Sequence, residues 1–322
     1  MSKVYEAIQR LENDSHEPLP GVSVEAKDAL KKAVEQAATH SSSESEASAS
    51  NSPEASVAED PIPAGGRGSK AAASAGDAKR FRIDEIAPEY VNLRPESRLF
   101  YYSQPDSPGA DRFRLLRMRL SPLWEAGKLK TLFVTSSHAQ DGKSTVVLNL
   151  ATALAEQGKR NVLVVEGDLC HPGLSSKLGI AERSGLAECL ESGADPLPLI
   201  RRLDPLGWHL LPAGRTRENS TELLQVPRLG EIFEQLRALY DWVVIDTPPI
   251  LPLTDTLTLR RHADAGLLVV RADRTPEEAV ERAIASIGSK NLLGLLLNGS
   301  VELDRLYSDY RHSYGRRKST QD

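Results

Sequence analysis

The stretch from Thr131 to Ala151 constrains the fold of this chain more than any other. It reads TLFVTSSHAQDGKSTVVLNLA, an apolar run, a short polar loop and a second apolar run after Gly142. This order predicts a buried strand, a tight loop and a helix whose first N–H groups converge on one point, which suits a polyphosphate. Gly142, Lys143 and Ser144 match the end of the P-loop pattern GxxxxGK[ST], whereas Ser137 occupies its first glycine position.

A P-loop of this kind would use two side chains directly. The ammonium of Lys143 would reach the β- and γ-phosphates of a nucleotide, and the hydroxyl of Ser144 would hold Mg²⁺. For this incomplete motif alone, an ordinary strand-to-helix turn with a surface lysine is the alternative. Two later motifs therefore decide between these interpretations.

Two further apolar runs each end on acids, NVLVVEGD at 161–168 and DWVVIDTPP at 241–249. Continuous apolar runs are typical of buried parallel strands, whose carboxyl ends are where an open α/β sheet binds its ligand. Acids beside a triphosphate repel it unless they hold a metal or accept a proton. A helix-cap or turn aspartate is the alternative for Asp246. The order Lys-Ser, Glu-x-Asp and Asp favours a nucleotide-Mg²⁺ site.

The remaining pattern alternates strands with helices. Further strands are predicted at 208–214, 264–273 and 291–300, and helices at 109–124, 143–157, 175–180, 184–193, 219–240 and 275–289. The spacing of Asn219 and Glu222 predicts a capping box, and Thr275 is expected as the N-cap before Pro276. The sequence thus predicts an α/β fold of the P-loop NTPase type, with a mostly parallel sheet and helices on both faces.

The chain divides into four predicted regions. Residues 1–39 contain short helices, and residues 40–80 are rich in Ser, Ala, Glu and Gly and too poor in large apolar residues to fold, which predicts a disordered linker. The globular domain is expected over 81–300, beginning with an extended, proline-punctuated approach at 81–108. Residues 301–322 form a polar, flexible tail that contains three tyrosines.

Composition limits the function classes. The net charge of -5 gives no reason to expect nucleic acid as a partner. Only two cysteines, Cys170 and Cys189, occur, without metal-ligand spacing, which fits a reducing cytosol. The N-terminus lacks the apolar core of a signal peptide, and no apolar run approaches the ~18 to 20 residues of a membrane span. A soluble chain is expected.

The helix predicted at 109–124 carries four arginines, Arg112, Arg114, Arg117 and Arg119, mostly away from an apolar face. That face is formed by Phe113, Leu116 and Leu120. The arginines indicate an interface with acidic groups of a neighbouring subunit, and a solvated basic face is the alternative.

From about Gly109 to its end, the chain resembles the bacterial tyrosine kinases of the CpsD/CapB type, which serve capsular and exopolysaccharide assembly. SSHAQDGKST is similar to their Walker A motif, VLVVEGDLCHP to their A′ motif and WVVIDTPP to their Walker B motif. RFRLLRMRL resembles the arginine-bearing helix through which family members form rings. ENSTELL and LLGLLLN also have counterparts, and the tail tyrosines lie where the family is autophosphorylated.

The resemblance implies a cytoplasmic, ATP- and Mg²⁺-dependent protein tyrosine autokinase that regulates capsular and exopolysaccharide biosynthesis and export. It would be a homo-oligomer, in ring form, that is recruited to the inner face of the plasma membrane by a membrane-bound polysaccharide co-polymerase acting as activator. Phosphate would pass in trans to the tail of a neighbouring subunit.

The resemblance also implies roles for individual residues. The catalytic residues would be Lys143, Glu166, Asp168 and Asp246, with Glu166 as the general base. The nucleotide would be bound by Asp141, Gly142, Lys143, Ser144, Thr145 and Asn298. The metal would be held by Ser144, Asp168 and Asp246. Oligomerisation would use Arg114 and Arg117. The phosphoacceptors would be Tyr307, Tyr310 and Tyr314.

The chain departs from the family pattern in four ways. The usual Pro-Gly-Glu of Walker A is Ala139-Gln140-Asp141, Cys170-His171 replaces the A′ arginine, the first A′ acid is Glu166 and the oligomerisation helix opens with Asp111. A non-catalytic ATP-binding switch or scaffold of the polysaccharide machinery is therefore the alternative function. An ATPase of the cell-division or plasmid-partition type is disfavoured, because His138 stands where those proteins usually carry lysine.

Overall fold

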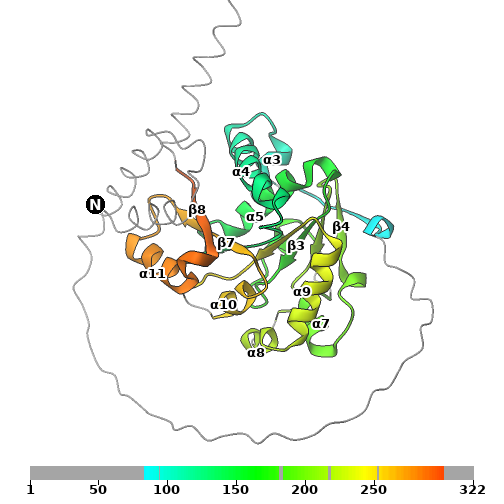
Figure 1. Cartoon of the computed structure of the whole chain (residues 1–322). Coiled ribbons are helices and arrows are strands. Elements are labelled where there is room, and N and C mark those ends of the chain that lie inside the picture. The colour runs from blue at the N-terminus through cyan, green and yellow to red at the C-terminus, as the bar shows by residue number, and fades with distance from the viewer. Residues whose placement is uncertain (1–82, 94, 181–183, 217–218, 252–253, 301–322) are drawn as a thin grey trace, which may run out of the picture.

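The structure, a computed structural model, describes residues 83–300 except 94, 181–183, 217–218 and 252–253 (Figure 1). The regions predicted at 1–39, 40–80 and 301–322 lie outside the described residues. Their predicted helices, disorder and flexibility stay predictions.

An eight-stranded sheet forms the centre of the described part, in the order β1-β4-β5-β3-β6-β2-β7-β8. Every neighbouring pair is parallel except β4 and β5. The strands are β1 (Pro88–Tyr90), β2 (Thr131–Ser136), β3 (Val162–Glu166), β4 (Arg201–Asp204), β5 (Trp208–Leu211), β6 (Trp242–Asp246), β7 (Ala265–Arg271) and β8 (Leu292–Asn298). The predicted α/β fold with a mostly parallel sheet is confirmed.

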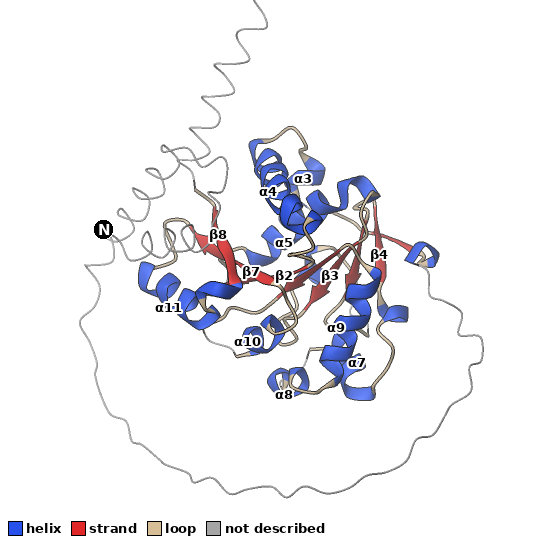
Figure 2. Ribbon diagram, viewed as in Figure 1, coloured by secondary structure: helices blue, strands red, loops and turns tan. Residues whose placement is uncertain are grey.

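Helices cover both faces of this sheet (Figure 2). One face carries α3 (Phe100–Ser103), α4 (Pro108–Glu125), α5 (Lys143–Ala155) and α6 (Leu174–Lys177). The other carries α7 (Leu186–Ser192), α8 (Ser220–Leu224), α9 (Arg228–Leu239), α10 (Asp255–Arg260) and α11 (Glu277–Ile287). Short 3₁₀ segments are η2 (Ile83–Glu85), η3 (Pro95–Ser97), η4 (Glu156–Gly158), η5 (Leu197–Leu199) and η6 (Ser289–Asn291).

The central strands β2, β3 and β6 are mostly apolar because each of their two faces packs into a separate core. Phe133 of β2 and Leu163 of β3 lie in the cluster under α7–α11, whereas their neighbours Leu132 and Val164 lie in the cluster under α4 and α5. Successive side chains of a strand point to opposite faces, so both alternating sets must be apolar.

The arginine-bearing helix is confirmed as α4. It starts at the N-cap Ser107, whose hydroxyl accepts a hydrogen bond from the N–H of Ala110 at 3.2 Å. Leu120 is buried, and Phe113 and Leu116 pack against the cluster on the α5 side of the sheet. The predicted apolar face is therefore the one that binds the sheet.

The approach at 81–108 is not simply extended, which corrects one prediction. It contains α3 and also β1, which pairs with β4 through Pro88 and Arg202. The strand β4 was not predicted, because its sequence RRLD lacks the apolar run of a central strand. It lies near the edge of the sheet, where β1 covers it and half-burial suffices.

Two helix predictions were wrong, one because the helix is interrupted and one in the identity of its N-cap. The helix predicted over 219–240 is two helices, α8 and α9, and the side chain of Asn219 makes no capping bond. Pro227, the N-cap of α9, lacks an N–H group, so a continuous helix would lose a bond there. The N-cap of α11 is Pro276, because the hydroxyl of Thr275 donates instead to Asp141 at 3.1 Å.

Candidate nucleotide-binding site

The loop between β2 and α5 is held by the end of β8. The side-chain amide of Asn298 donates to the carbonyl oxygen of Asp141 at 2.9 Å. Gly142 has a φ of 101°, and a Cβ atom there would lie 2.0 Å from Nδ2 of Asn298. Only glycine fits this position without displacing Asn298, so both predicted residues contribute to the shape of the loop.

Asp141 closes the loop from the inside. It is buried, and one carboxylate oxygen accepts a hydrogen bond from the N–H of His138 at 3.0 Å. The other oxygen accepts the hydroxyl of Thr275 at 3.1 Å, which ties the loop to the segment after β7. Both oxygens are thus engaged within the chain, so Asp141 shapes the loop rather than offering its side chain to a nucleotide. The participation of Thr275 was missed, since it was assigned to a helix cap.

The backbone of the loop adopts a left-handed conformation where the family pattern has glycine. Gln140 has a φ of 68°, in the left-handed region that favours glycine. A side chain in this region costs on the order of 1 kcal/mol. Ser137, at the first glycine position of the pattern, is buried and donates to the carbonyl oxygen of Ala279 at 3.4 Å. Larger residues, Ser137 and Gln140, thus occupy two loop positions at which glycine is usual.

The first turn of α5 offers unused backbone donors. Its first internal hydrogen bond runs from the N–H of Val146 to the carbonyl oxygen of Gly142 at 3.0 Å. Within the described residues, the N–H groups of Lys143, Ser144 and Thr145 have no backbone acceptor. Free donors at the start of a thirteen-residue helix, with its dipole, form a site for an anion such as a phosphate.

Charged side chains from three motifs meet beside this helix start. The ammonium nitrogen of Lys143 lies 3.3 Å from Oδ2 of Asp168 and 3.9 Å from Oδ1 of Asp246. Ser144 donates its hydroxyl to Oδ2 of Asp246 at 2.9 Å. Burial would lower the pKa of Lys143, but Asp246 and then Asp168 outweigh it and raise the pKa. The predicted grouping of Lys143, Ser144, Asp168 and Asp246 therefore exists in the structure.

The carboxylate of Asp246 suits a metal cation. Its side chain is fully buried, and its Oδ1 has no hydrogen-bond partner within the described residues. Burial raises the pKa of Asp246 to about 6, although Lys143 and the hydroxyl of Ser144 act in the opposite direction. Mg²⁺ takes one or two carboxylates together with substrate phosphates and waters. Ser144, Asp168 and the oxygen of Asp246 that accepts no hydrogen bond fit such an ion.

Glu166 does not fit the role of general base that the resemblance implied. Its side chain is fully buried. Oε1 accepts the N–H groups of Leu174 at 2.7 Å and Ser175 at 3.2 Å. Oε2 accepts the hydroxyl of Ser175 at 2.6 Å and the N–H of Ala213 at 3.2 Å. A base needs a free lone pair within reach of the substrate proton, so this geometry argues for a structural carboxylate.

Cys170, in the segment after β3, is linked by hydrogen bonds to the helices α8 and α10. The thiol of Cys170 lies 3.0 Å from the hydroxyl of Ser220, which donates to the buried Asp255 at 2.7 Å. Asp255 accepts a second hydrogen bond from Thr221 at 2.5 Å. This network was not predicted, because its members lie on three separate segments of the chain.

The other predicted residues lie elsewhere. Arg114 is bound within its own chain, to Asp111 and to the carbonyl oxygen of Pro105, both at 2.5 Å. Arg117 donates to the carbonyl oxygen of Ala153 at 3.4 Å. The tyrosines Tyr307, Tyr310 and Tyr314 lie outside the described residues. Among the helices that are described, none is long and apolar enough to cross a membrane.

Comparison with known proteins gives a family. Residues 129–318, more than half of the chain, match the family model described as cellulose biosynthesis protein BcsQ. The chain is 29% identical over 222 residues to the putative tyrosine-protein kinase CapB of Staphylococcus aureus, which spans 68% of this chain and 96% of CapB. It is 31% identical over 249 residues to the succinoglycan biosynthesis transport protein ExoP of Rhizobium meliloti (strain 1021), covering 73% of this chain but only 31% of ExoP.

A solved structure agrees at the level of the fold. The kinase domain of the Escherichia coli tyrosine kinase ETK superposes with a TM-score of 0.57, at 24% identity, over 69% of this chain and 83% of that domain. The ETK kinase domain and the described part of this chain thus share the same fold. The chain belongs to the family described as cellulose biosynthesis protein BcsQ, and its similarity to CapB agrees with the motifs that it shares with the bacterial tyrosine kinases of the CpsD/CapB type.

Proposed function

We propose that this protein is a Mg-ATP-dependent protein tyrosine autokinase that regulates capsular or exopolysaccharide biosynthesis and export. This proposal is carried by Oδ1 of Asp246, which is buried, accepts no hydrogen bond from the described residues and lies 3.9 Å from the ammonium of Lys143. An acid in that position is unfavourable by itself and becomes favourable when a cation binds. The names of CapB and of the ETK kinase domain support the choice of a tyrosine kinase over other nucleotide-dependent proteins.

The residues of the chain would divide the work as follows. The N–H groups at the start of α5 and the ammonium of Lys143 bind the phosphates and neutralise their charge. Ser144, Asp168 and Asp246 hold Mg²⁺, which supplies charge neutralisation at the phosphate oxygens when bound. Glu166 is fixed by four hydrogen bonds. Oδ1 of Asp168 accepts the N–H of His171 at 3.0 Å and its Oδ2 accepts Lys143 at 3.3 Å, so we assign the general base to neither acid. Transfer of the γ-phosphoryl group to Tyr307, Tyr310 or Tyr314 would occur in trans.

A second candidate function is an ATP-dependent switch or scaffold without phosphotransfer. Two observations favour it, the engaged carboxylate of Glu166 and the left-handed Gln140 where the related loops have glycine. Both leave nucleotide binding intact and bear on the speed of chemistry. The two functions differ in one product, phosphotyrosine.

Incubation with Mg-ATP should produce phosphotyrosine in the wild-type protein and not in Lys143→Met. The substitution removes the charge beside the phosphates while keeping a side chain of similar length. An anti-phosphotyrosine blot of the purified full chain measures the product. Nucleotide binding without any blot signal in the wild type would identify the scaffold.

Helix α4 is the candidate surface for a homo-oligomer. Arg114 and Arg117 bind their own chain, so they support the helix rather than reach outward. Leu115 and Met118 are 50% and 64% exposed, and Arg119 is exposed beside them. Large apolar side chains exposed on one helix face favour contact with another subunit. The interface proposed for a ring therefore centres on Leu115 and Met118.

The double variant Leu115→Asp/Met118→Asp should lower the molar mass measured by light scattering in the presence of Mg-nucleotide. Charges in the centre of a contact cannot be desolvated without cost, so association should weaken by at least about tenfold. Tyr90→Asp/Tyr102→Asp removes two other exposed large apolar residues and serves as the matched control. Equal masses for both double variants would exclude α4 as the interface.

Two further parts of the proposal concern regulation. A membrane-bound polysaccharide co-polymerase would recruit the kinase to the inner face of the plasma membrane and stimulate it. Each tail phosphate would add a charge of about −1.5 to −2. Repulsion between phosphorylated tails would loosen the oligomer, and dephosphorylation would restore it.

A further inference from the structure

The starts of the parallel strands meet at the edge of the sheet opposite the nucleotide-binding loop. Thr131 of β2 pairs with Val243, and Val162 of β3 pairs with Trp242, so the strands begin at a common level. Segments reach this level just before β2, β3, β5, β6, β7 and β8, and the one before β5, 204–207, carries the acid Asp204. The other five carry the basic residues. They are 125–130, 156–161, 237–241, 260–264 and 287–291, and we call them together the amino edge.

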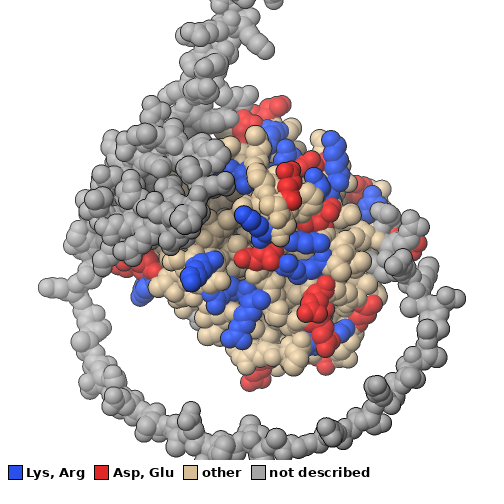
Figure 3. Space-filling view, viewed as in Figure 1, with Lys and Arg blue, Asp and Glu red and all other residues tan. Residues whose placement is uncertain are grey.

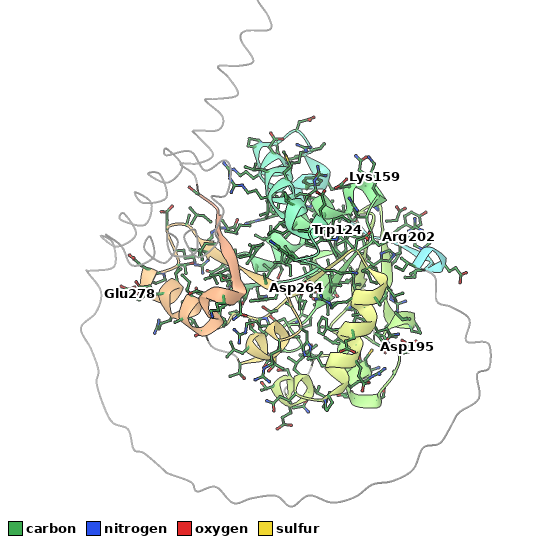
Figure 4. The ribbon with its side chains drawn as sticks, viewed as in Figure 1. Trp124, Lys159, Asp195, Arg202, Asp264 and Glu278 are labelled. Carbon is green, nitrogen blue, oxygen red and sulfur yellow. The ribbon has the colours of Figure 1, made fainter. Side chains whose placement is uncertain are left out.

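The amino edge is positively charged on a negatively charged protein. Its five segments contain eight basic and four acidic residues, whereas the whole chain has a net charge of -5. Lys and Arg side chains gather over the middle of the face in Figure 3, and Figure 4 labels Lys159 and Asp264 from two of the segments. The basic residues are Lys128, Lys130, Lys159, Arg160, Arg237, Arg260, Arg261 and Lys290.

Three of the four acids are used within the fold. Asp264 accepts the N–H groups of Lys130 and Thr131 at 2.8 and 2.7 Å, and Arg237 at 2.9 Å. Asp241 accepts the N–H of Asn161 at 2.9 Å. Glu156 lies 4.0 Å from Arg117 of α4. These acids bind backbone groups and arginines, so they neutralise little of the lysine charge.

Five of the eight bases are available to a partner. Arg237 binds Asp264, Arg160 stacks 4.1 Å over the ring of Trp124, and Arg260 donates to the carbonyl oxygen of Ile287. The side chains of the other five form no hydrogen bond or ion pair with the described residues. These five are Lys128, Lys130, Lys159, Arg261 and Lys290.

Helix dipoles do not account for the lysines. Basic residues in the last turn of a helix interact favourably with its C-terminus. The last turns of α4, α5 and α11 contain no basic residue, and Lys128, Lys159 and Lys290 lie beyond those helix ends. The charges of Lys128 and Lys159 thus have no evident role in stabilising the helices, whereas Arg237 and Arg260 lie in the last turns of α9 and α10.

We propose that the amino edge docks on an anionic lipid bilayer. Four of the five available bases are lysines, whose compact charges suit the lipid phosphates of a flat surface. Of the four large apolar residues exposed in the described part, Tyr90 alone borders the amino edge, because it pairs with Asp204 next to the start of β5, and Tyr102, Leu115 and Met118 lie outside its segments. A protein partner would instead use an apolar contact core. Docking this way leaves the nucleotide-binding loop at the edge away from the bilayer.

Co-sedimentation of the full chain with phosphatidylglycerol-containing vesicles tests this proposal without nucleotide, so kinase activity does not affect the result. The wild type should bind at about 50 mM salt and be released at about 500 mM, because screening shortens the range of the charges. The affinity of Lys159→Glu/Lys290→Glu for these vesicles should be lower by at least about tenfold, because each basic residue near an anionic surface contributes to binding. Pure phosphatidylcholine vesicles should bind neither protein.

Arg215→Glu/Arg282→Glu is the matched control, since it makes the same change in charge at exposed residues outside the amino edge. It should bind like the wild type. Circular dichroism checks that both double variants are folded, and Lys159→Gln/Lys290→Gln provides a milder second test. Equal binding of the wild type and both lysine variants, or no wild-type binding to phosphatidylglycerol vesicles at low salt, would overturn the proposal.

Discussion

Asp246→Asn should abolish the dependence of nucleotide binding on Mg²⁺ while leaving the ligand-free protein at least as stable as the wild type. Asp246 is fully buried, and its pKa is raised to about 6, chiefly by burial. A neutral amide removes an unfavourable buried charge, and Asp168, at 3.3 Å, remains as the ion-pair partner of Lys143. The ligand-free variant should therefore gain on the order of 1 to 3 kcal/mol above pH 7. Loss of the metal ligand should weaken Mg-nucleotide binding by at least about tenfold.

The sign of the pH dependence follows from the raised pKa. A group whose folded-state pKa lies above its unfolded value contributes stability below the unfolded pKa, and this contribution is lost as the pH rises through the folded pKa. For Asp246 the loss falls between about pH 4 and 6. Mg-ADP should consequently raise the melting temperature of the wild type more at pH 8 than at pH 5.

Asp255→Asn is the matched control, because Asp255 is also a buried aspartate but has both oxygens bound, to Ser220 and Thr221. Its neutralisation should lower stability by about 1 to 3 kcal/mol. Thermal unfolding with and without Mg-ADP distinguishes the two variants. A ligand-free Asp246→Asn protein that is clearly less stable than the wild type, or that keeps the full Mg²⁺ effect, would contradict the assignment of a metal ligand.

Glu166→Gln should destabilise the fold rather than slow phosphotransfer selectively. The amide keeps one oxygen acceptor, but its NH₂ group would face donors among Leu174, Ser175 and Ala213. Leaving buried donors unsatisfied costs about 1 to 3 kcal/mol. Denaturant unfolding measures this loss, and phosphotransfer per folded molecule measures the chemistry. Unchanged stability with a large loss of transfer would restore Glu166 as the general base.

The sequence predicts most of the sheet because its central strands bury both faces. Continuous apolar runs mark β2, β3 and β6, and the carboxyl ends of two of these strands carry Asp168 and Asp246 to the site. The strand β4 escaped prediction, because RRLD is polar and pairs antiparallel to β5 near the sheet edge. An apolar run appears in the sequence only where a strand is buried on both faces, and β4 is only half-buried.

The site was predicted in position but not in every role. Spacing places Glu166 at the end of β3, yet the donors that engage it come from α6 and from Ala213 after β5. Likewise the partner of Thr275 is Asp141, which lies 134 residues away along the chain. Long-range hydrogen bonds of this kind leave no local pattern, so a sequence cannot show which acids are free.

Arg114 and Arg117 illustrate the same limit on a surface. Their positive charge indicated contacts with acids of another subunit, whereas both side chains bind within the chain. The exposed residues between them are Leu115 and Met118. The proposed interface therefore rests on exposed apolar residues, and the prediction that Arg114 and Arg117 mediate oligomerisation stays a prediction.

Phosphoryl transfer between two marked copies tests the proposed kinase most directly. The donor carries Tyr307→Phe, Tyr310→Phe and Tyr314→Phe, and the acceptor carries Lys143→Met. Neither can complete the reaction alone if Lys143 binds the phosphates and the tail tyrosines accept them. Incubated together with Mg-ATP, the pair should yield phosphate on Tyr307, Tyr310 or Tyr314 of the acceptor, identified by mass spectrometry. A wild-type protein and a mixed pair that both bind Mg-ATP but contain no phosphotyrosine would contradict the kinase.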